Sequence, residues 1–223
     1  MMRWSRPEIY KTVRDLSRYM TAGTTQEHVK AMERVMIFCL TARNRGLELR
    51  PNAEWNENPE FKLRILERSD SDYAKDEETR KSVNGTSTFL CGAPIIQRST
   101  MQKIVALLVR EAELIAATTM AQDMIFVKRL LESINLRVEL LMILEVNNKW
   151  AVDLINHYSV VCRTHHMETR QYYLRELKEQ GVISVKWKAG TENSSDLYTK
   201  NLARKEFEKH ARAYVGHDTC MEP

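Results

Sequence analysis

The chain has 223 residues and a formal net charge of +4, and 43% of its residues are hydrophobic and 29% are charged. These values are typical of a globular protein with one large domain, or one domain and an appendage, and they exclude general disorder. The four cysteines lie far apart and have no metal-ligand spacing. No apolar run approaches the length of a membrane span, and the N-terminus has no apolar signal segment. We therefore expect an intracellular protein, cytoplasmic or nuclear and not secreted, with no membrane contact.

Two helices are expected in residues 1–50, which also carry the basic excess of the chain. Pro7 can open the first, over 7–20. Thr24 and Glu27 have the spacing of a capping box, which opens a second helix that ends near Gly46. The second helix has an apolar stripe at helical spacing, formed by Val29, Met32, Met36 and Leu40. The two helices should form a hairpin.

From residue 61 the pattern changes to short strands. Residues 51–60 are polar and contain two prolines, which indicates a surface connection. Strands are expected from 61 to about 68, over 83–91 and over 95–98, as an antiparallel meander. The later elements are a helix over about 106–134, a strand over 138–144, helices at 151–155 and 166–180, a strand over 182–188, and a helix capped by Ser194 or Ser195. This order predicts a mixed α/β fold, in which helices flank both faces of a five-stranded mixed sheet and a helical hairpin precedes it.

Four polar residues occupy related places in this predicted fold. Asp70 follows the first strand, Asn147 follows the fourth, Asp196 opens the last helix, and Glu113 lies in the long helix. Glu111 and Glu113 point about 200° apart on a helix, so only one of them can serve a site beside Asp70. Carboxylates gathered at strand ends can hold two Mg²⁺ ions and clamp a phosphodiester for attack by water. A turn or a cap is the alternative reading of the Asp70 cluster.

Several stretches, in their order and spacing, resemble the ribonuclease H region at the end of the copia-type retrotransposon Pol polyprotein. The matching stretches are Ser69–Ala74, Arg80–Gly85, Val105–Leu107, Glu111–Ala116, Arg163–His166 and Asp196–Lys200. The resemblance covers about 61–210. Residues 1–50 resemble the end of the preceding reverse transcriptase, its thumb or connection, and 211–223 are expected to be a C-terminal tail. The resemblance implies a ribonuclease H-like fold.

The resemblance also implies a site. The family's catalytic carboxylates fall on Asp70, Glu113 and Asp196, which would be the metal ligands of a two-Mg²⁺ site. The fourth catalytic position, an Asp in the family, is Asn147 here. An amide oxygen can ligate Mg²⁺ but cannot offset its charge, so we expect the site to be defective. Asp72 or Glu145 would be the residue to compensate.

Candidate residues for binding nucleic acid are basic side chains near these motifs. They are Lys186, Lys188, Lys200, Arg204, Arg163 and His166. Basic residues also occur on surfaces without a role, and His166 can be a structural residue at a helix start.

Two hypotheses on function stay open at this stage. The first is a ribonuclease H-type endonuclease that cuts RNA in RNA–DNA hybrids with Mg²⁺ and is weak or inactive because of Asn147. The second is a non-catalytic relic, or a reused nucleic-acid-binding or interaction module. The expected partners are an RNA–DNA hybrid and the remainder of a reverse transcriptase, and the oligomeric state is left open. Because that partner is missing, we expect the hairpin to pack sparingly on the 61–210 domain, with its apolar stripe either exposed or buried in a self-association contact.

Overall fold

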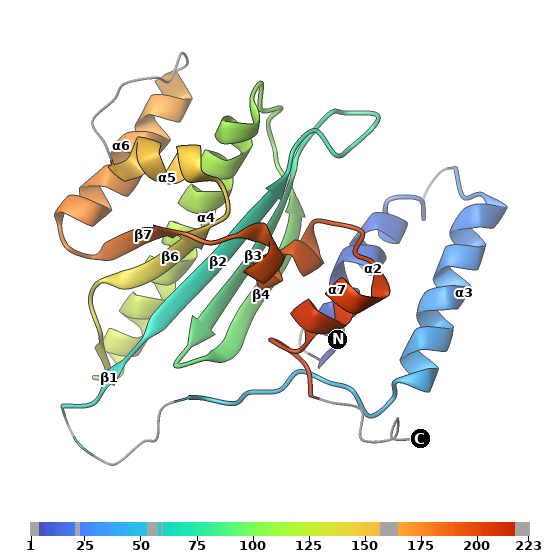
Figure 1. Ribbon diagram of the computed structural model, residues 1–223, viewed down its shortest axis with the longest axis horizontal. Helices are drawn as coiled ribbons and strands as arrows, with labels where there is room; N and C mark the ends of the chain where they lie inside the picture. Colours follow the sequence, from blue (N-terminus) through green and yellow to red (C-terminus); the bar gives the residue numbers. More distant parts are fainter. Residues whose placement is uncertain (1–4, 21–22, 53–57, 59, 157–164, 217–223) are drawn as a thin grey trace.

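The computed structural model describes residues 5–20, 23–52, 58, 60–156 and 165–216. Its centre is a five-stranded mixed sheet in the order β4-β3-β2-β6-β7 (Figure 1). The strands are β2 (Ile65–Asp72), β3 (Val83–Leu90), β4 (Ala93–Met101), β6 (Met142–Val146) and β7 (Ile183–Trp187). Strands β2, β3 and β4 form an antiparallel meander. β6 pairs with β2 in parallel, and β7 pairs with β6 in parallel. The predicted meander and mixed sheet are confirmed.

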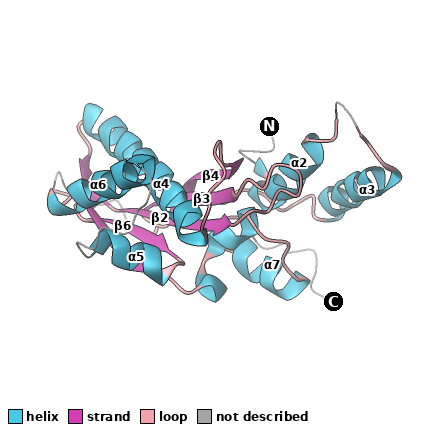
Figure 2. Ribbon diagram, turned by 90° about the horizontal axis from the view of Figure 1, so that it is seen from above, coloured by secondary structure: helices cyan, strands magenta, loops and turns pink. Residues whose placement is uncertain are grey.

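Helices cover both faces of the sheet, as predicted, and each face has its own core. The helices on one face are α4 (Val109–Ser133), α5 (Lys149–Asn156) and α6 (His165–Glu179). They pack on Ile65, Leu144 and Ile183 of the sheet. The helices at the other core are η3 (Ser194–Tyr198) and α7 (Arg204–Ala211), where Phe89 and Tyr214 are buried. Figure 2 shows α4 and α6 together against the strands, with α7, α2 and α3 toward the other end.

The central strand β2 extends past its parallel neighbour, and this places Asp70. Pairing with β6 ends at Ser69 and Val146, whereas pairing with β3 continues from Asp70 opposite Gly85 to the end of β2. Asp70 therefore lies inside β2, whereas the sequence predicts that it follows the strand. Its side chain emerges at the point where the parallel half of the sheet stops, and parallel strand ends are where sites form.

The apolar pattern predicted for a fourth strand over 138–144 belongs to two different strands. β5 (Arg137–Val138) pairs with β1 (Lys62–Leu63) in a separate two-stranded sheet. β6 starts only at Met142. Between them Leu140 and Leu141 are exposed, so the alternation of apolar residues continues across a change of sheet. Periodicity alone does not reveal such a change.

The N-terminal helices differ from the prediction at their boundaries. The helix expected over 7–20 is a 3₁₀ turn, η1 (Pro7–Ile9), followed by α2 (Tyr10–Ser17). α2 is attached to the sheet by polar contacts, since Arg14 Nη1 donates to Ser99 Oγ at 2.7 Å and Arg18 pairs with Asp76 at 2.6 Å.

None of the helices in the described ranges is long and apolar enough to cross a membrane.

The second helix, α3 (Gln26–Thr41), is capped by Thr25 and not by Thr24. The backbone of Thr25 is extended, its hydroxyl accepts the His28 N–H, and the His28 ring accepts the Thr25 N–H. A histidine thus replaces the glutamate of the expected capping box. No residue of α3 is buried, and its apolar stripe is exposed, as predicted. The expectation of sparing packing is wrong for the first helical segment, where Pro7, Glu8, Ile9 and Lys11 are buried.

The domain limits at 50, 60 and 210 stay a prediction. Two observations bear on how the ends of the chain pack. Leu47, after α3, forms a β-bridge with Val215. Tyr214 and Val215 are buried in the core beneath η3, so the segment after α7 contributes to that core.

Candidate active site

Asp70 is the centre of a polar cluster at the edge of the parallel strands. Its side chain is 1% exposed, and three groups donate hydrogen bonds to it. The Thr199 hydroxyl donates to Oδ2, and the Asn147 amide nitrogen donates to Oδ1. Lys200 Nζ also donates to Oδ1, at 3.2 Å. Both carboxylate oxygens of Asp70 therefore have partners from the chain itself.

The 3₁₀ helix η3 brings Asp196 to this cluster because it is tied to the backbone of β2. Asn193 caps η3 and also donates to the Ser69 carbonyl at 2.5 Å, and the Ser195 hydroxyl donates to the Arg68 carbonyl at 2.9 Å. The predicted cap, Ser194 or Ser195, is therefore wrong. An asparagine has both an acceptor and a donor, so it can cap the helix and hold the strand at once.

Glu113 is the α4 carboxylate that faces the cluster. It is 3% exposed, whereas Glu111 lies at the helix start and accepts the Leu107 N–H at 2.8 Å. This matches the expected choice between the two. Burial, and then the Asp70 charge, raise the pKa of Glu113 well above its usual value, and Asp196 adds to the rise. A buried carboxyl beside two others holds its proton more tightly.

Asp196 and Lys200 form an ion pair at the open side of the cluster. Lys200 Nζ lies 2.8 Å from Asp196 Oδ2. Burial and the Asp70 charge raise the pKa of Asp196 to about 6, against the lowering effect of Lys200. Burial lowers the pKa of Lys200, but Asp70 and Asp196 outweigh it and the net pKa is raised. The ammonium thus bridges two carboxylates.

The donor chemistry of the cluster suits a divalent cation. Glu113 Oε2 and Asp196 Oδ1 are buried and have no hydrogen-bond partner among the described residues. Carboxylate oxygens are the ligands that Mg²⁺ prefers. The described ranges contain no group of three or more His, Cys, Asp or Glu side chains already arranged around one metal position. The residues fit such an ion by their chemistry, while Lys200 lies between two of the carboxylates.

The two residues expected to compensate for Asn147 have other partners. Asp72 pairs with Lys75 at 3.3 Å. Glu145 pairs with Arg68 at 2.8 Å and lies 3.9 Å from Lys188. Each of these carboxylates therefore forms an ion pair with a basic side chain outside the Asp70 cluster.

The candidate nucleic-acid-binding residues come from several separate parts of the chain. Lys186 and Arg204 are exposed, and Lys188 lies between Glu145 and Glu192. Arg163 lies outside the described residues, and only the backbone of His166, at the start of α6, is described. Lys200 is the one candidate of this set that the structure brings to Asp70.

Trp187 is a feature of the site edge that the sequence did not reveal. Its strand position suggests a core residue, yet it is 46% exposed. Its indole Nε1 donates to the Asn147 carbonyl at 3.0 Å, and Lys149 Nζ lies 4.4 Å from the centre of its rings. Trp187 lies at the end of its strand, where alternation no longer determines burial. It fixes the backbone that carries Asn147.

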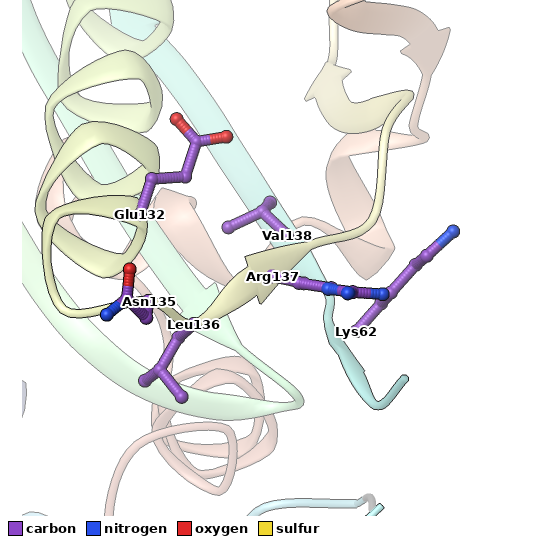
Figure 3. Close-up of a pocket in the computed structure, with 6 residues that line it drawn as sticks. All are labelled: Lys62, Glu132, Asn135, Leu136, Arg137 and Val138. Carbon is purple, nitrogen blue, oxygen red and sulfur yellow. The ribbon is translucent and has the colours of Figure 1, made fainter. Parts of the chain in front are cut away.

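A pocket lies elsewhere, between the end of α4 and strand β5 (Figure 3). It is lined by Lys62, Glu132, Asn135, Leu136, Arg137 and Val138. Lys62 and Asp70 are eight positions apart along extended chain, which places the pocket roughly 25 Å from the cluster. Glu132 is its one acidic residue, and Lys128 pairs with it at 2.6 Å. The pocket therefore has no part in the carboxylate cluster.

Comparison with known proteins finds Pol polyproteins of retrotransposons among the relatives of this chain. The chain is 34% identical over 140 residues to the retrovirus-related Pol polyprotein from transposon TNT 1-94 of Nicotiana tabacum, a match covering 63% of the chain and 10% of that protein. It is 26% identical over 208 residues to the Pol polyprotein from transposon RE1 of Arabidopsis thaliana, covering 93% of the chain and 14% of that protein. The chain thus spans about a tenth to a seventh of the relatives it matches.

No family model matches the chain. Among solved structures, it is similar to the N-terminal RNase H domain of rv2228c from Mycobacterium tuberculosis, solved as a fusion with maltose-binding protein. That match has a TM-score of 0.44 and 10% identity, and covers 68% of the chain and 98% of that structure. The sequence matches confirm the resemblance that the motifs indicated to retrotransposon Pol polyproteins.

Proposed function

We propose that this chain is a ribonuclease H-type domain that binds RNA–DNA hybrids and cleaves their RNA strand, at a rate that Asn147 greatly reduces. The observation that carries the proposal is the meeting of Asp70, Glu113 and Asp196 at the end of the parallel strands. They come from three distant parts of the chain, and two of them have raised pKa values. Such clusters of perturbed carboxyls are typical of active sites. The similarity to Pol polyproteins supports the same reading.

The residues of the chain have distinct roles in this proposal. Asp70, Glu113 and Asp196 would hold Mg²⁺, which in the two-ion mechanism activates a water molecule and stabilises the charge that develops on the phosphodiester. Asp70 is the fixed point of the site, since it is buried and held by Thr199. The exposed Lys186 and Arg204 would contact backbone phosphates, and hybrid binding would then weaken as the salt concentration rises.

Asn147 is the reason for the expected defect. Its amide nitrogen, and not its oxygen, faces Asp70 in this structure. An aspartate at 147 would add one negative charge to the three of the cluster, and four carboxylates balance the charge of two divalent ions. With three, the second ion should bind poorly, so cleavage should suffer more than hybrid binding, which depends on Lys and Arg.

The test is Mg²⁺-dependent cleavage of a labelled RNA–DNA hybrid, with hybrid binding measured in Ca²⁺. We expect weak or no cleavage by the unmodified chain and an increase in Asn147→Asp. The matched control is Asn148→Asp, which adds the same charge at the next residue. The Asn148 side chain accepts the Ala151 N–H at 3.1 Å. The control should not gain activity. Strong cleavage by the unmodified chain that Asp70→Ala abolishes would show that Asn147 is tolerated.

A second candidate function is a non-catalytic relic or a reused module that binds nucleic acid. One observation favours it: the oxygens of Asp70 already have Thr199, Asn147 and Lys200 as partners. Hybrid binding with no cleavage, even in Asn147→Asp, would support this candidate over the first.

We propose further that the remainder of a reverse transcriptase is the partner of the N-terminal helices. The exposed apolar stripe of α3 supports this, because such faces are usually covered. We also propose an intracellular location. Cys39 and Cys91, the cysteines within the described ranges, are free thiols.

A further inference from the structure

Lys200 contacts two carboxylates of the site at once. Its Nζ lies 2.8 Å from Asp196 Oδ2 and 3.2 Å from Asp70 Oδ1. One contact is local, four positions along the chain, and the other spans 130 positions. A positive charge between two carboxylates is the arrangement that a bridging metal ion would otherwise provide.

This contact differs from an ordinary surface ion pair. Lys128 and Glu132 form such a pair, also four positions apart, and it involves no third residue in the described structure. Lys200 instead reaches Asp70, whose side chain is 1% exposed. A buried carboxylate needs a cation or donors close by, whereas exposed pairs contribute little. The position of the Lys200 ammonium is thus part of the site.

The formal charges of the cluster then suit one divalent ion. Asp70, Glu113 and Asp196 contribute −3, Lys200 contributes +1, and Asn147 is neutral, so the sum is −2. The acceptors that remain also point to one ion. Asp70 has donors on both oxygens, while Glu113 Oε2 and Asp196 Oδ1 are buried and have no partner among the described residues.

We propose that this chain binds one divalent cation and that the Lys200 ammonium takes the place of the second. The inference rests on the ligand set of the proposed function. It connects two features of the sequence: Asn147 removes one negative charge from the site, and Lys200 supplies one positive charge to it. Lys200 would then remain beside Asp70 and Asp196 while Glu113 and Asp196 offer their open oxygens to the metal.

The experiment is Mn²⁺ binding to the full 223-residue chain, by isothermal titration calorimetry and by electron paramagnetic resonance of free Mn²⁺. We expect one ion per unmodified chain. Lys200→Gln should bind its first ion about tenfold more tightly, because a nearby positive charge no longer repels it. Lys200→Arg keeps the charge and should behave as the unmodified chain. Lys128→Gln, which breaks the Lys128–Glu132 pair, should leave the affinity and the number of bound ions unchanged.

A double variant tests the replacement itself. Asn147→Asp with Lys200→Gln gives four carboxylates and no ammonium, and should bind two ions. Two ions in the unmodified chain, equal affinity in Lys200→Gln, or one ion in the double variant would each overturn the inference. Lys200→Arg behaving as Lys200→Gln would do the same, since charge would not be the cause. Circular dichroism melting identifies any variant that fails to fold, and the stoichiometry of the unmodified chain still decides.

Metal binding and cleavage can fail separately. Two bound ions with hybrid cleavage would refute the role of Lys200 and leave the nuclease proposal intact. One bound ion in the unmodified chain, with no cleavage even in Asn147→Asp, would support the role of Lys200 and count against the nuclease. No Mn²⁺ binding at all would overturn both.

Discussion

Gly85 permits the close approach that builds the site, and its replacement by alanine should destabilise the protein. Gly85 pairs with Asp70 across the sheet. A Cβ atom there would lie 2.7 Å from the Ser195 carbonyl oxygen, 2.8 Å from Thr199 Cγ2 and 3.0 Å from Tyr198 Cβ. All three contacts belong to η3 or the residue after it. The 3₁₀ helix that carries Asp196 therefore rests directly on this glycine.

The loss of stability in Gly85→Ala depends on whether η3 can move away from the added methyl group. η3 is held to β2 by Asn193 and Ser195, so it cannot shift without losing hydrogen bonds to the Ser69 and Arg68 carbonyls. Overpacking of this kind costs about 1–3 kcal/mol. For a chain of this size, 1 kcal/mol corresponds to roughly 2–4 °C in Tm. We expect Gly85→Ala to lower Tm by about 4–8 °C, taking a loss of about 2 kcal/mol.

The matched control is Gly190→Ala, at the same site. A Cβ at Gly190 would meet Asp196 Oδ2 at 3.8 Å and Asn147 Nδ2 at 3.9 Å, which are ordinary contacts. We expect a change within about 0.5 kcal/mol, or a slight gain from reduced freedom of the unfolded chain. Urea unfolding and thermal melting of both variants give the comparison. Gly85→Ala as stable as the unmodified chain, or equal losses in both variants, would refute the argument.

Three further outcomes are expected. Burial raises the pKa of Glu67 well above its usual value, so the folded chain keeps a proton that the unfolded chain loses. The stability of the fold therefore falls as the pH rises above about 4.5, the pKa of this residue in the unfolded chain. Glu67→Gln should raise Tm at about pH 8 and leave it unchanged at about pH 4. Asn147→Asp sets a second carboxylate against Asp70, so its Tm should fall without Mg²⁺ and recover with it, unlike that of the unmodified chain. Met36→Gln, on the exposed face of α3, should change the free energy of unfolding by less than about 0.5 kcal/mol, measured in urea.

The sheet was predictable because its elements are long and their patterns are strong. β3 was predicted from its β-branched and aromatic residues and α4 from its apolar stripe, and their boundaries differ from the prediction by a few residues. The failures have local causes. The fourth strand was predicted as one element because an apolar alternation runs unbroken through β5 and β6, although the chain changes sheets between them. The hydrogen bonds that divide them are not visible in a sequence.

The convergence of the candidate site residues was predictable from the sequence, and their contacts were less so. The resemblance supplied Asp70, Glu113 and Asp196, and the structure brings them together. The role of Lys200 was read as phosphate binding, because a lysine near a nuclease motif suggests that role. Its spacing of four from Asp196 was the available signal, since residues four apart can pair on one face of a helix. Its contact with Asp70 depends on how η3 lies on β2 and has no signature in the sequence.

The fold and the proposed metal site place different requirements on the surroundings of Asp70. A buried carboxylate requires donors, and Thr199, Asn147 and Lys200 provide them without any metal. An aspartate at 147 would remove one donor and add a like charge, so the metal-free fold would lose stability while metal binding gained it. Asn147 therefore favours a protein that is stable by itself over one that depends on Mg²⁺. At this position, the same amide group that donates a hydrogen bond to Asp70 occupies the place where the resemblance implies a carboxylate.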